Sequence, residues 1–556
     1  MTKAKDRLIY LPLGGAGEIG MNAYVYGWGK PGQERLILVD LGVTFPDMDS
    51  TPGVNLIMPD IGFLKANRDR LEAIFITHAH EDHVGAVGRL WSELQVPVYA
   101  RAFTGHLARL KMEEAGQDPG NVRIVAPWPE TVAAGPFKVS FVPISHSIPE
   151  SAGLVIDSPA GRLVHTGDFK LDPTPGVGEP WDEALWREAT AGRVRALVCD
   201  STNVFSPHPG RSEAGLPAPI SKLVAAAPHM VVATTFASNV ARVKTLAEAG
   251  HAAGRSVCLL GRAMRRMVEA ALKTGVVENF PKTITPEDAR DIPRENLMLI
   301  VTGSQGERRA ASGQLSRGKY LGLTMAEGDT FLFSSKTIPG NERGVIRVLN
   351  AFSEMGVDVV AENDLYHVSG HANRPDIEKM HALVDPEFVI PMHGEHRHLR
   401  EHAKLAEANG RRSLVVVNGA MANLTGATPH VVDHIEADRV YLDGDILIGA
   451  LDGVVRDRIR LALNGHVIIQ VILEEGEPLG EPWVELVGLP ETGKSRAPLA
   501  EVLEEDLGQF LMRAGAKTLR DDAKIEEELV RVAKKTAQDE IGRKPEVTVV
   551  VSRLEA

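Results

Sequence analysis

Short apolar runs rich in valine, isoleucine and leucine recur along the chain, and most are followed by a glycine or a polar residue. In the first part of the chain they fall at 36–39, 71–76, 141–144 and 161–164. Runs of this length are typical of buried strands, because a buried helix needs a longer apolar segment. The pattern therefore predicts a sheet-rich first domain.

A different alternation follows between residues 206 and 366, where strand-like runs take turns with helix-like segments. The strand-like runs are 230–235, 257–260, 297–301 and 330–333, and the clearest helix-like segments are 239–249 and 343–355. Alternation of this kind favours a parallel α/β sheet whose functional loops lie at the carboxyl ends of the strands.

Four candidate metal ligands, His78, His80, Asp82 and His83, follow directly after the strand-like run 71–76. In an extended chain alternate side chains point the same way, so the first two histidines can share one metal. A helix that begins just after His80 would turn Asp82 and His83 to the other side, where they can hold a second metal. Imidazole and carboxylate ligands are those expected for zinc or manganese.

Other strand ends carry residues that could complete two metal shells. These residues are His146, Asp168 and His393. A single histidine at a strand end is more often a hydrogen-bonding residue than a ligand, so only the combination with the first motif is informative. Two divalent cations about 3.5–4 Å apart could bind both the attacking and the leaving oxygen of a displacement at phosphorus. Asp40, which follows another strand-like run, is a candidate carboxylate for orienting a ligating histidine.

The order of these motifs resembles that of a known family. Thr-His-x-His-x-Asp-His at 77–83, with a downstream histidine and Gly-Asp, resembles the metallo-β-lactamase fold, a four-layered αββα sandwich. Segments 196–203, 367–372 and 391–394 resemble motifs A, B and C of its β-CASP branch, which processes nucleic acids. With the glycine-rich segment 14–22 and a long C-terminal extension, the resemblance extends to the bacterial ribonuclease J family and covers essentially all 556 residues.

The resemblance implies a role for each matching residue. Two Zn²⁺ per subunit would be held by His78, His80 and His146 and by Asp82, His83 and His393, with Asp168 bridging them. Mn²⁺ or Mg²⁺ could also support activity. Asp82, Asp200 and His371 would be catalytic, the last two near the leaving group, where a carboxylate–imidazole pair can deliver a proton. In this family a histidine in motif C accompanies RNA processing, whereas DNA-directed relatives carry valine, so His393 favours RNA.

The resemblance also implies a pocket for the 5′ phosphate of single-stranded RNA. Its residues would be Ser238, Asn239, His367, Val368, Ser369, Gly370 and His371. Ser238 and Asn239 open a helix-like segment, and there the sequence leaves two interpretations: an anion site at the helix N-terminus, or an ordinary N-cap. The implied enzyme is a zinc-dependent ribonuclease, a 5′→3′ exonuclease that prefers 5′-monophosphate RNA, with some endonuclease activity, acting in mRNA decay and rRNA maturation.

The late position of His393 predicts that a domain is inserted between two parts of one sandwich. We expect the metallo-β-lactamase domain at 1–205 and 367–425, and the β-CASP domain at 206–366. A linker at 426–456 and a small α+β domain at 457–556, for dimerisation or RNA positioning, would follow. Asp443 lies in an expected turn of the linker, where the carboxylates could bind a further cation.

Composition agrees with a large cytoplasmic enzyme. No apolar run is long enough to cross a bilayer, no signal segment opens the chain, and there are only two cysteines. The net charge of −13 is unusual for a nucleic-acid enzyme, so we expect a focused channel near the metals, with local basic clusters such as 262–266 and 397–400. We expect a homodimer or higher homo-oligomer, partners in an RNA-degradation complex, and no association with a membrane.

Two other functions fit the sequence less well than a nuclease. A small-molecule hydrolase of the β-lactamase or glyoxalase type would need neither the long insertion nor the pair Asp200 and His371. A catalytically weak scaffold subunit would not need seven intact metal ligands. The glycine pattern at 15–20 matches that of a dinucleotide-binding loop. Such a loop must be followed by a helix, whereas the alternating residues after this one predict a strand.

Overall fold

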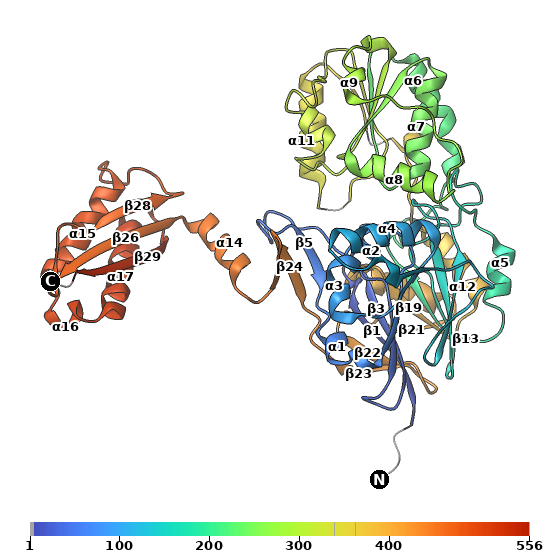
Figure 1. Ribbon diagram of the computed structural model, residues 1–556, viewed down its shortest axis with the longest axis horizontal. Coiled ribbons are helices and arrows are strands. Elements are labelled where there is room, and N and C mark those ends of the chain that lie inside the picture. The colour runs from blue at the N-terminus through green and yellow to red at the C-terminus, as the bar shows by residue number, and fades with distance from the viewer. Residues whose placement is uncertain (1–4, 339, 362, 555–556) are drawn as a thin grey trace. The chain divides into compact units, whose positions relative to one another are not determined.

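Two sheets pack face to face around the first hydrophobic core (Figure 1). The first has the strand order β23-β22-β1-β3-β4-β6-β7-β8 and the second β21-β19-β13-β12-β11-β10-β9. The first is built from β1 (Arg7–Gly14), β3 (Ala23–Gly29), β4 (Arg35–Val39), β6 (Leu71–Phe75), β7 (Val98–Ala100), β8 (Val122–Ile124), β22 (Ala420–Asn423) and β23 (His430–His434). The second is built from β9 (Val132–Ala134), β10 (Phe137–Pro143), β11 (Ala152–Ser158), β12 (Gly161–His165), β13 (Val194–Asp200), β19 (Phe388–Met392) and β21 (Arg412–Ser413).

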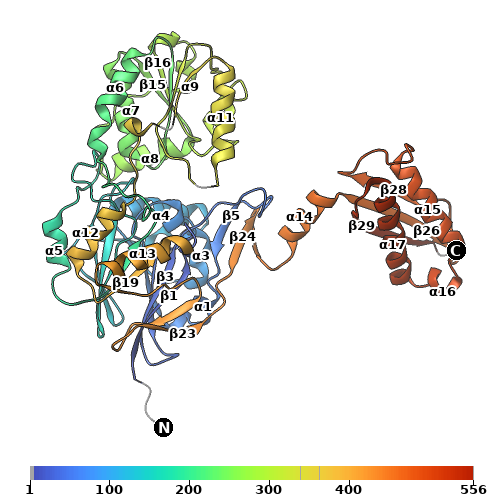
Figure 2. The same cartoon turned by 180° about the vertical axis from the view of Figure 1, so that it is seen from behind.

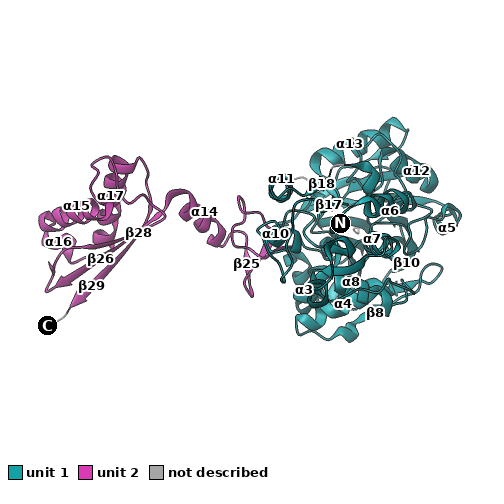
Figure 3. Cartoon of the chain, turned by 90° about the horizontal axis from the view of Figure 1, so that it is seen from above, with its two compact units in different colours: residues 1–44, 58–439 teal, residues 45–57, 440–556 magenta. Residues whose placement is uncertain are grey.

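The computed structural model describes residues 5–338, 340–361 and 363–554. The chain divides into two units, residues 1–44 with 58–439 and residues 45–57 with 440–556 (Figure 3). No helix among the described residues combines the length and the apolar character needed to cross a membrane.

Helices cover the outer faces of both sheets and complete an αββα sandwich, which confirms the expected fold class. On the side of the first sheet lie α3 (Val87–Leu94) and α4 (Ala102–Glu114), which pack against each other. On the side of the second sheet lie α5 (Glu183–Ala189), α12 (Arg374–Val384) and α13 (His396–Ala408), seen from behind in Figure 2.

The insertion forms a separate parallel sheet with the order β15-β16-β14-β17-β18. Its strands are β14 (Val231–Thr234), β15 (Ser256–Leu260), β16 (Leu297–Val301), β17 (Thr330–Phe333) and β18 (Asp358–Val360), and its longer helices are α6 (Pro217–Ala226), α7 (Val240–Ala252), α8 (Arg262–Lys273) and α11 (Glu342–Glu354). The four predicted strands and the two predicted helices are confirmed. The fifth strand, β18, was not predicted from the sequence, because it is only three residues long and begins with an exposed aspartate.

The second unit has its own core. One face of a sheet made of β26 (His466–Glu474), β28 (Trp483–Val487) and β29 (Glu546–Leu554) packs against α15 (Leu499–Arg513) and α17 (Asp522–Ile541). The segment expected as a linker contains a hairpin of β24 (Arg439–Asp443) and β25 (Ile446–Gly449), and α14 (Val454–Asn464) follows it. The hairpin forms because the two-residue turn Gly444–Asp445, with Gly444 at φ 62°, joins two short apolar runs, 440–442 and 446–448.

Candidate metal centre and active site

The first ligand motif lies where β6 ends and α2 (Glu81–Val84) begins. His80 has an extended backbone (φ −66°, ψ 148°) and is the residue directly before this helix. His78 and His80 therefore leave the chain from an extended segment, whereas Asp82 and His83 leave it from a helical turn. This is the predicted change of direction at Glu81, and it separates the four side chains into two groups.

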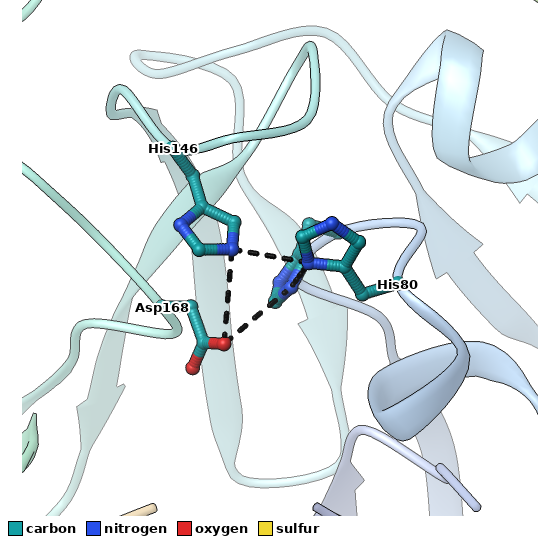
Figure 4. A group of neighbouring side chains, drawn as sticks. His80, His146 and Asp168 are labelled. Carbon is teal, nitrogen blue, oxygen red and sulfur yellow. Dashed lines mark hydrogen bonds and ion pairs between the residues drawn. The ribbon is translucent and has the colours of Figure 1, made fainter. Parts of the chain in front are cut away.

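One group of ligand atoms gathers around His80 (Figure 4). Its Nδ1 lies 3.1 Å from His78 Nε2 and 3.0 Å from His146 Nε2. Asp168 Oδ2 lies 3.8 Å from the Nε2 atoms of His78 and His146. Three imidazole nitrogens and one carboxylate oxygen, within 4.8 Å of one another, form a tetrahedral-type donor set.

A second group shares Asp168 with the first. Its other members are Asp82, His83 and His393. Asp168 Oδ2 lies 3.2 Å from His83 Nε2, while Asp168 Oδ1 lies 2.7 Å from His393 Nδ1. Asp82 Oδ2 lies 3.2 Å from His393 Nε2. Asp168 is thus placed so that its two oxygens face both groups.

The donors fit divalent cations. Asp168 Oδ1 and His393 Nε2 are buried, and instead of forming a well-directed hydrogen bond each lies at ion-pair distance from another candidate ligand, His393 Nδ1 and Asp82 Oδ2 respectively. Burial lowers the pKa of His80 to about 4, so its imidazole is neutral and free to ligate. Burial also opposes a charge on His393, but the carboxylates of Asp168 and Asp82 outweigh it and raise the pKa of His393 to about 10. A bound cation would replace this proton as the positive charge beside the carboxylates of Asp168 and Asp82.

Neighbouring groups fix the orientation of two of the candidate ligand rings. Asp40 Oδ2 lies 2.7 Å from His83 Nδ1, and the same carboxylate accepts hydrogen bonds from the backbone N–H (2.8 Å) and the hydroxyl of Thr77. The carbonyl oxygen of Gly370 lies 2.6 Å from His146 Nδ1. An oxygen behind the non-ligating nitrogen sets the tautomer and the angle of a metal-binding imidazole.

Asp200 and His371 form a pair next to the shared carboxylate. His371 Nδ1 lies 2.9 Å from Asp200 Oδ2 and 4.0 Å from Asp168 Oδ2. Asp200 Oδ1 accepts hydrogen bonds from the backbone N–H (2.8 Å) and the hydroxyl (2.7 Å) of Thr202, which hold the carboxylate in place. Burial opposes a charge on His371, but Asp200 outweighs it and raises the pKa of His371 above its usual value.

The residues expected at the phosphate pocket have different surroundings. Ser238 Oγ lies 3.1 Å from His80 Nε2, at the edge of the first ligand group. The Asn239 side chain accepts a hydrogen bond from the Arg242 backbone N–H (2.9 Å), so it caps α7. His367 Nδ1 lies 3.5 Å from Arg242 Nη1, and Val368 is buried in the hydrophobic core of the insertion.

The remaining residues of the expected pocket make hydrogen bonds that hold the segments around the candidate metal centre. The Ser369 hydroxyl accepts hydrogen bonds from the Asn203 side-chain amide (2.7 Å) and from the His371 backbone N–H (3.1 Å). Gly370 is the residue whose carbonyl faces His146. Segment 367–371 therefore connects the insertion to both ligand groups of the sandwich.

Two buried polar networks were not predicted from the sequence. The fully buried Arg242 pairs with Glu213 (2.9 Å) and donates to the Ser334 carbonyl (2.9 Å). The second network lies behind Asp200, where Ser201 Oγ is 2.9 Å from His402 Nδ1 and His402 Nε2 is 2.9 Å from His381 Nε2. The sequence feature that could have indicated the first network is Arg242, a charged residue on the apolar side of the helix-like segment 239–249.

Gly42, in the loop that follows β4, allows the backbone of this loop to lie close to the candidate ligand motif. A Cβ at this position would overlap the backbone carbonyl of Asp82. We expect Gly42→Ala to push the motif outward, costing about 1–3 kcal/mol, and to lower the metal content without changing any ligand. Elemental analysis of dialysed protein and a thermal unfolding curve would measure both effects. Gly215→Ala is the control, because its Cβ meets no atom within 4 Å; equal metal content in both variants would contradict the prediction.

The sandwich, its inserted α/β domain and the two joined ligand groups define a metallohydrolase of the metallo-β-lactamase superfamily, whose family model matches residues 17–199. The chain belongs to the ribonuclease J family. The ribonuclease J β-CASP domain matches residues 228–352, the Zn-dependent metallo-hydrolase RNA specificity domain 356–416, and the ribonuclease J C-terminal domain 453–554.

Similar proteins cover nearly the whole chain. Ribonuclease J of Sinorhizobium meliloti is 39% identical over 99% of this chain and 98% of its own length. Ribonuclease J of Thermus thermophilus is 32% identical over 98% of this chain and 95% of its own. A crystal structure of a protein of unknown function from Enterococcus faecalis V583 has a TM-score of 0.53 at 17% identity, covering 75% of this chain and 100% of that one, a likeness of fold alone.

Proposed function

We propose that this chain, a metal-dependent ribonuclease, binds two zinc ions and removes nucleotides from the 5′ end of single-stranded RNA. It prefers a 5′ monophosphate, also cuts internally to some extent, and acts in mRNA decay and rRNA maturation in the cytoplasm. The observation that carries the proposal is the position of Asp168, whose oxygens face both ligand groups while the pair of Asp200 and His371 lies beside it.

In this proposal His78, His80 and His146 would hold one zinc ion, Asp82, His83 and His393 would hold the other, and Asp168 would be shared between them. When bound, the two ions supply Lewis acidity that activates water and neutralises charge on the phosphate. Asp40 and the Gly370 carbonyl keep the ligating rings in one orientation, so the site is formed before the substrate arrives.

The proposed role of His371 is to give a proton to the leaving oxygen. Its Nδ1 faces Asp200, which leaves Nε2 as the nitrogen that can donate. Asp200 favours the protonated imidazole and holds the ring, because a buried carboxylate stabilises a neighbouring positive charge. The carboxylate itself is held by Thr202, so the pair cannot rotate away from Asp168 without losing these bonds.

The preference for a 5′ monophosphate is supported by hydroxyl groups and a helix N-terminus in the inserted domain. Ser238 Oγ lies beside His80 and directly precedes the capped start of α7, where the positive end of the helix dipole favours anions. Thr235 and Ser335, at the ends of β14 and β17, carry buried hydroxyls with no hydrogen-bond partner in the described part of the chain. A phosphate held there would present the first internucleotide bond to the metals, so cleavage would release one nucleotide.

RNA labelled at its 3′ end and bearing either a 5′ monophosphate or a 5′ hydroxyl tests the proposal in the presence of Mn²⁺. We expect a ladder with one-nucleotide steps that forms faster from the monophosphate substrate. Internal cuts that ignore the 5′ end would overturn the exonuclease proposal but leave the metal site standing. A chain with both metals and no cleavage at all would favour a scaffold.

Ser238→Ala tests the pocket itself. Losing one hydrogen bond to a charged phosphate costs about 1.5–3 kcal/mol, so the rate preference for the monophosphate should fall by about tenfold or more. The measurement is the ratio of kcat/KM for the two substrates. Ser221→Ala, on helix α6, is the matched control. An unchanged ratio in the Ser238 variant would exclude this hydroxyl from the pocket.

A further inference from the structure

An exposed aromatic side chain follows motif A. Phe205 lies five residues after Asp200, and 47% of its surface is exposed. The loop that carries it is well fixed, because Val204 is fully buried and the Ser206 carbonyl accepts a hydrogen bond from the Arg374 backbone N–H (3.0 Å). The ring is therefore presented to solvent on a backbone that the core and α12 hold in place.

Two residues at the start of α13 contact this ring. Arg397 Cζ lies 5.3 Å from the ring centroid, and the His398 ring lies 5.3 Å away at an angle of 63°. Nearly half of the Phe205 side chain nevertheless stays open. A guanidinium over an aromatic ring together with free aromatic surface is the arrangement on which nucleic-acid bases stack.

The three side chains lie next to the catalytic loops. Gly394 directly follows His393, and a Cβ added to Gly394 would lie 2.9 Å from His398 Cβ and 3.3 Å from Ser201 Cβ. The Phe205 contact thus joins the loop that carries Asp200 to the loop that carries His393. An RNA strand whose scissile phosphate reaches Asp168 has to pass near these two loops.

Two arginines that adjoin the Phe205 loop are paired with carboxylates. Arg397 Nε lies 3.5 Å from Glu395 Oε2, and Arg374 pairs with Glu401. Balanced charge gives little attraction for the phosphate backbone, which needs unpaired cations and would show strong salt dependence. It leaves stacking on a π-face as the main interaction that this surface offers.

We propose that Phe205 and Arg397 form a stacking platform for one base of the single-stranded RNA, outside the metal centre. The inference rests on the ribonuclease activity proposed above and adds a binding subsite to it. Stacking of one base on an aromatic side chain contributes about 1–3 kcal/mol, so its loss weakens RNA binding about 5–150-fold. Every base has a π-face, so the platform tolerates any sequence but needs a base to be present.

The test measures binding without cleavage. The full chain is titrated against 5′-phosphorylated, 3′-fluorescein RNA in EDTA, using fluorescence anisotropy, and a single abasic site is moved along the strand. At one position the abasic site should weaken binding to the wild type about tenfold and leave binding to Phe205→Ala unchanged, because the two changes remove the same contact. Phe205→Trp should restore affinity, whereas Phe205→Leu, which keeps apolar bulk but has no π-face, should not.

The controls separate this inference from the proposed function. Phe45→Ala removes another exposed phenylalanine and should bind like the wild type. The inference is overturned if Phe205→Ala binds RNA normally, if its defect and that of every abasic site simply add, or if Phe205→Leu restores binding. If wild-type protein binds no RNA in EDTA or with Mn²⁺, the ribonuclease proposal fails first. A Phe205 defect of equal size at low and high salt supports stacking, and a steep salt dependence contradicts it.

Discussion

Asp168→Asn is expected to abolish RNA hydrolysis while the chain stays folded. The carboxylate faces both ligand groups, and asparagine keeps its shape but loses its charge. A cation contributes several kcal/mol of charge stabilisation to the reaction, so the rate should fall by at least about 10³-fold. Metal content should drop as well, since the one side chain shared by the two groups would no longer balance two divalent charges.

Elemental analysis and cleavage of labelled RNA measure the two effects, and circular dichroism checks the fold. Asp157→Asn is the matched control, because this aspartate lies in β11, pairs with Arg162 and has 45% of its side chain exposed. Full metal content with full activity in the Asp168 variant would remove the centre from the mechanism.

His371→Gln should separate metal binding from proton transfer. Glutamine can still contact Asp200 but cannot donate a proton as an acid, so kcat should fall by about 10²–10⁴-fold. Both metals should remain, because His371 belongs to neither of the two groups assigned to the ions. KM should change little, since the change acts on the chemical step.

Steady-state kinetics and metal analysis of the same preparation provide the measurement. His430→Gln, at an exposed position in β23, controls for the loss of a histidine as such. A wild-type kcat would exclude His371 from proton transfer, and loss of one metal would instead make it a ligand.

Residues whose chemistry follows local chain geometry could be predicted from the sequence. His78, His80, Asp82 and His83 are within six residues, and a strand followed by a helical turn suffices to divide them. The role of Asn239 could not be decided locally, because a helix cap and an anion site use the same residue types. The structure shows its side chain capping α7.

Contacts between residues that are distant in sequence were not predictable. Ser201 meets His402 across two hundred residues, and nothing in either segment indicates the other. Arg242 and Glu213 are each ordinary charged residues until the fold buries them together. Similarly, the hairpin β24–β25 was expected only as a turn, because its flanking strands are short and half exposed.

The insertion between β13 and β19 has a consequence for the chain while it is being synthesised. β13 is buried along its full length and pairs in parallel with β19, which leaves the ribosome about 190 residues later. At about 5–20 residues per second, the edge of β13 waits about 10–40 s for its neighbour. During that time an apolar strand edge is open to other nascent chains, which is a recognised route to aggregation. Slower translation of the insertion should therefore lower the yield of native protein.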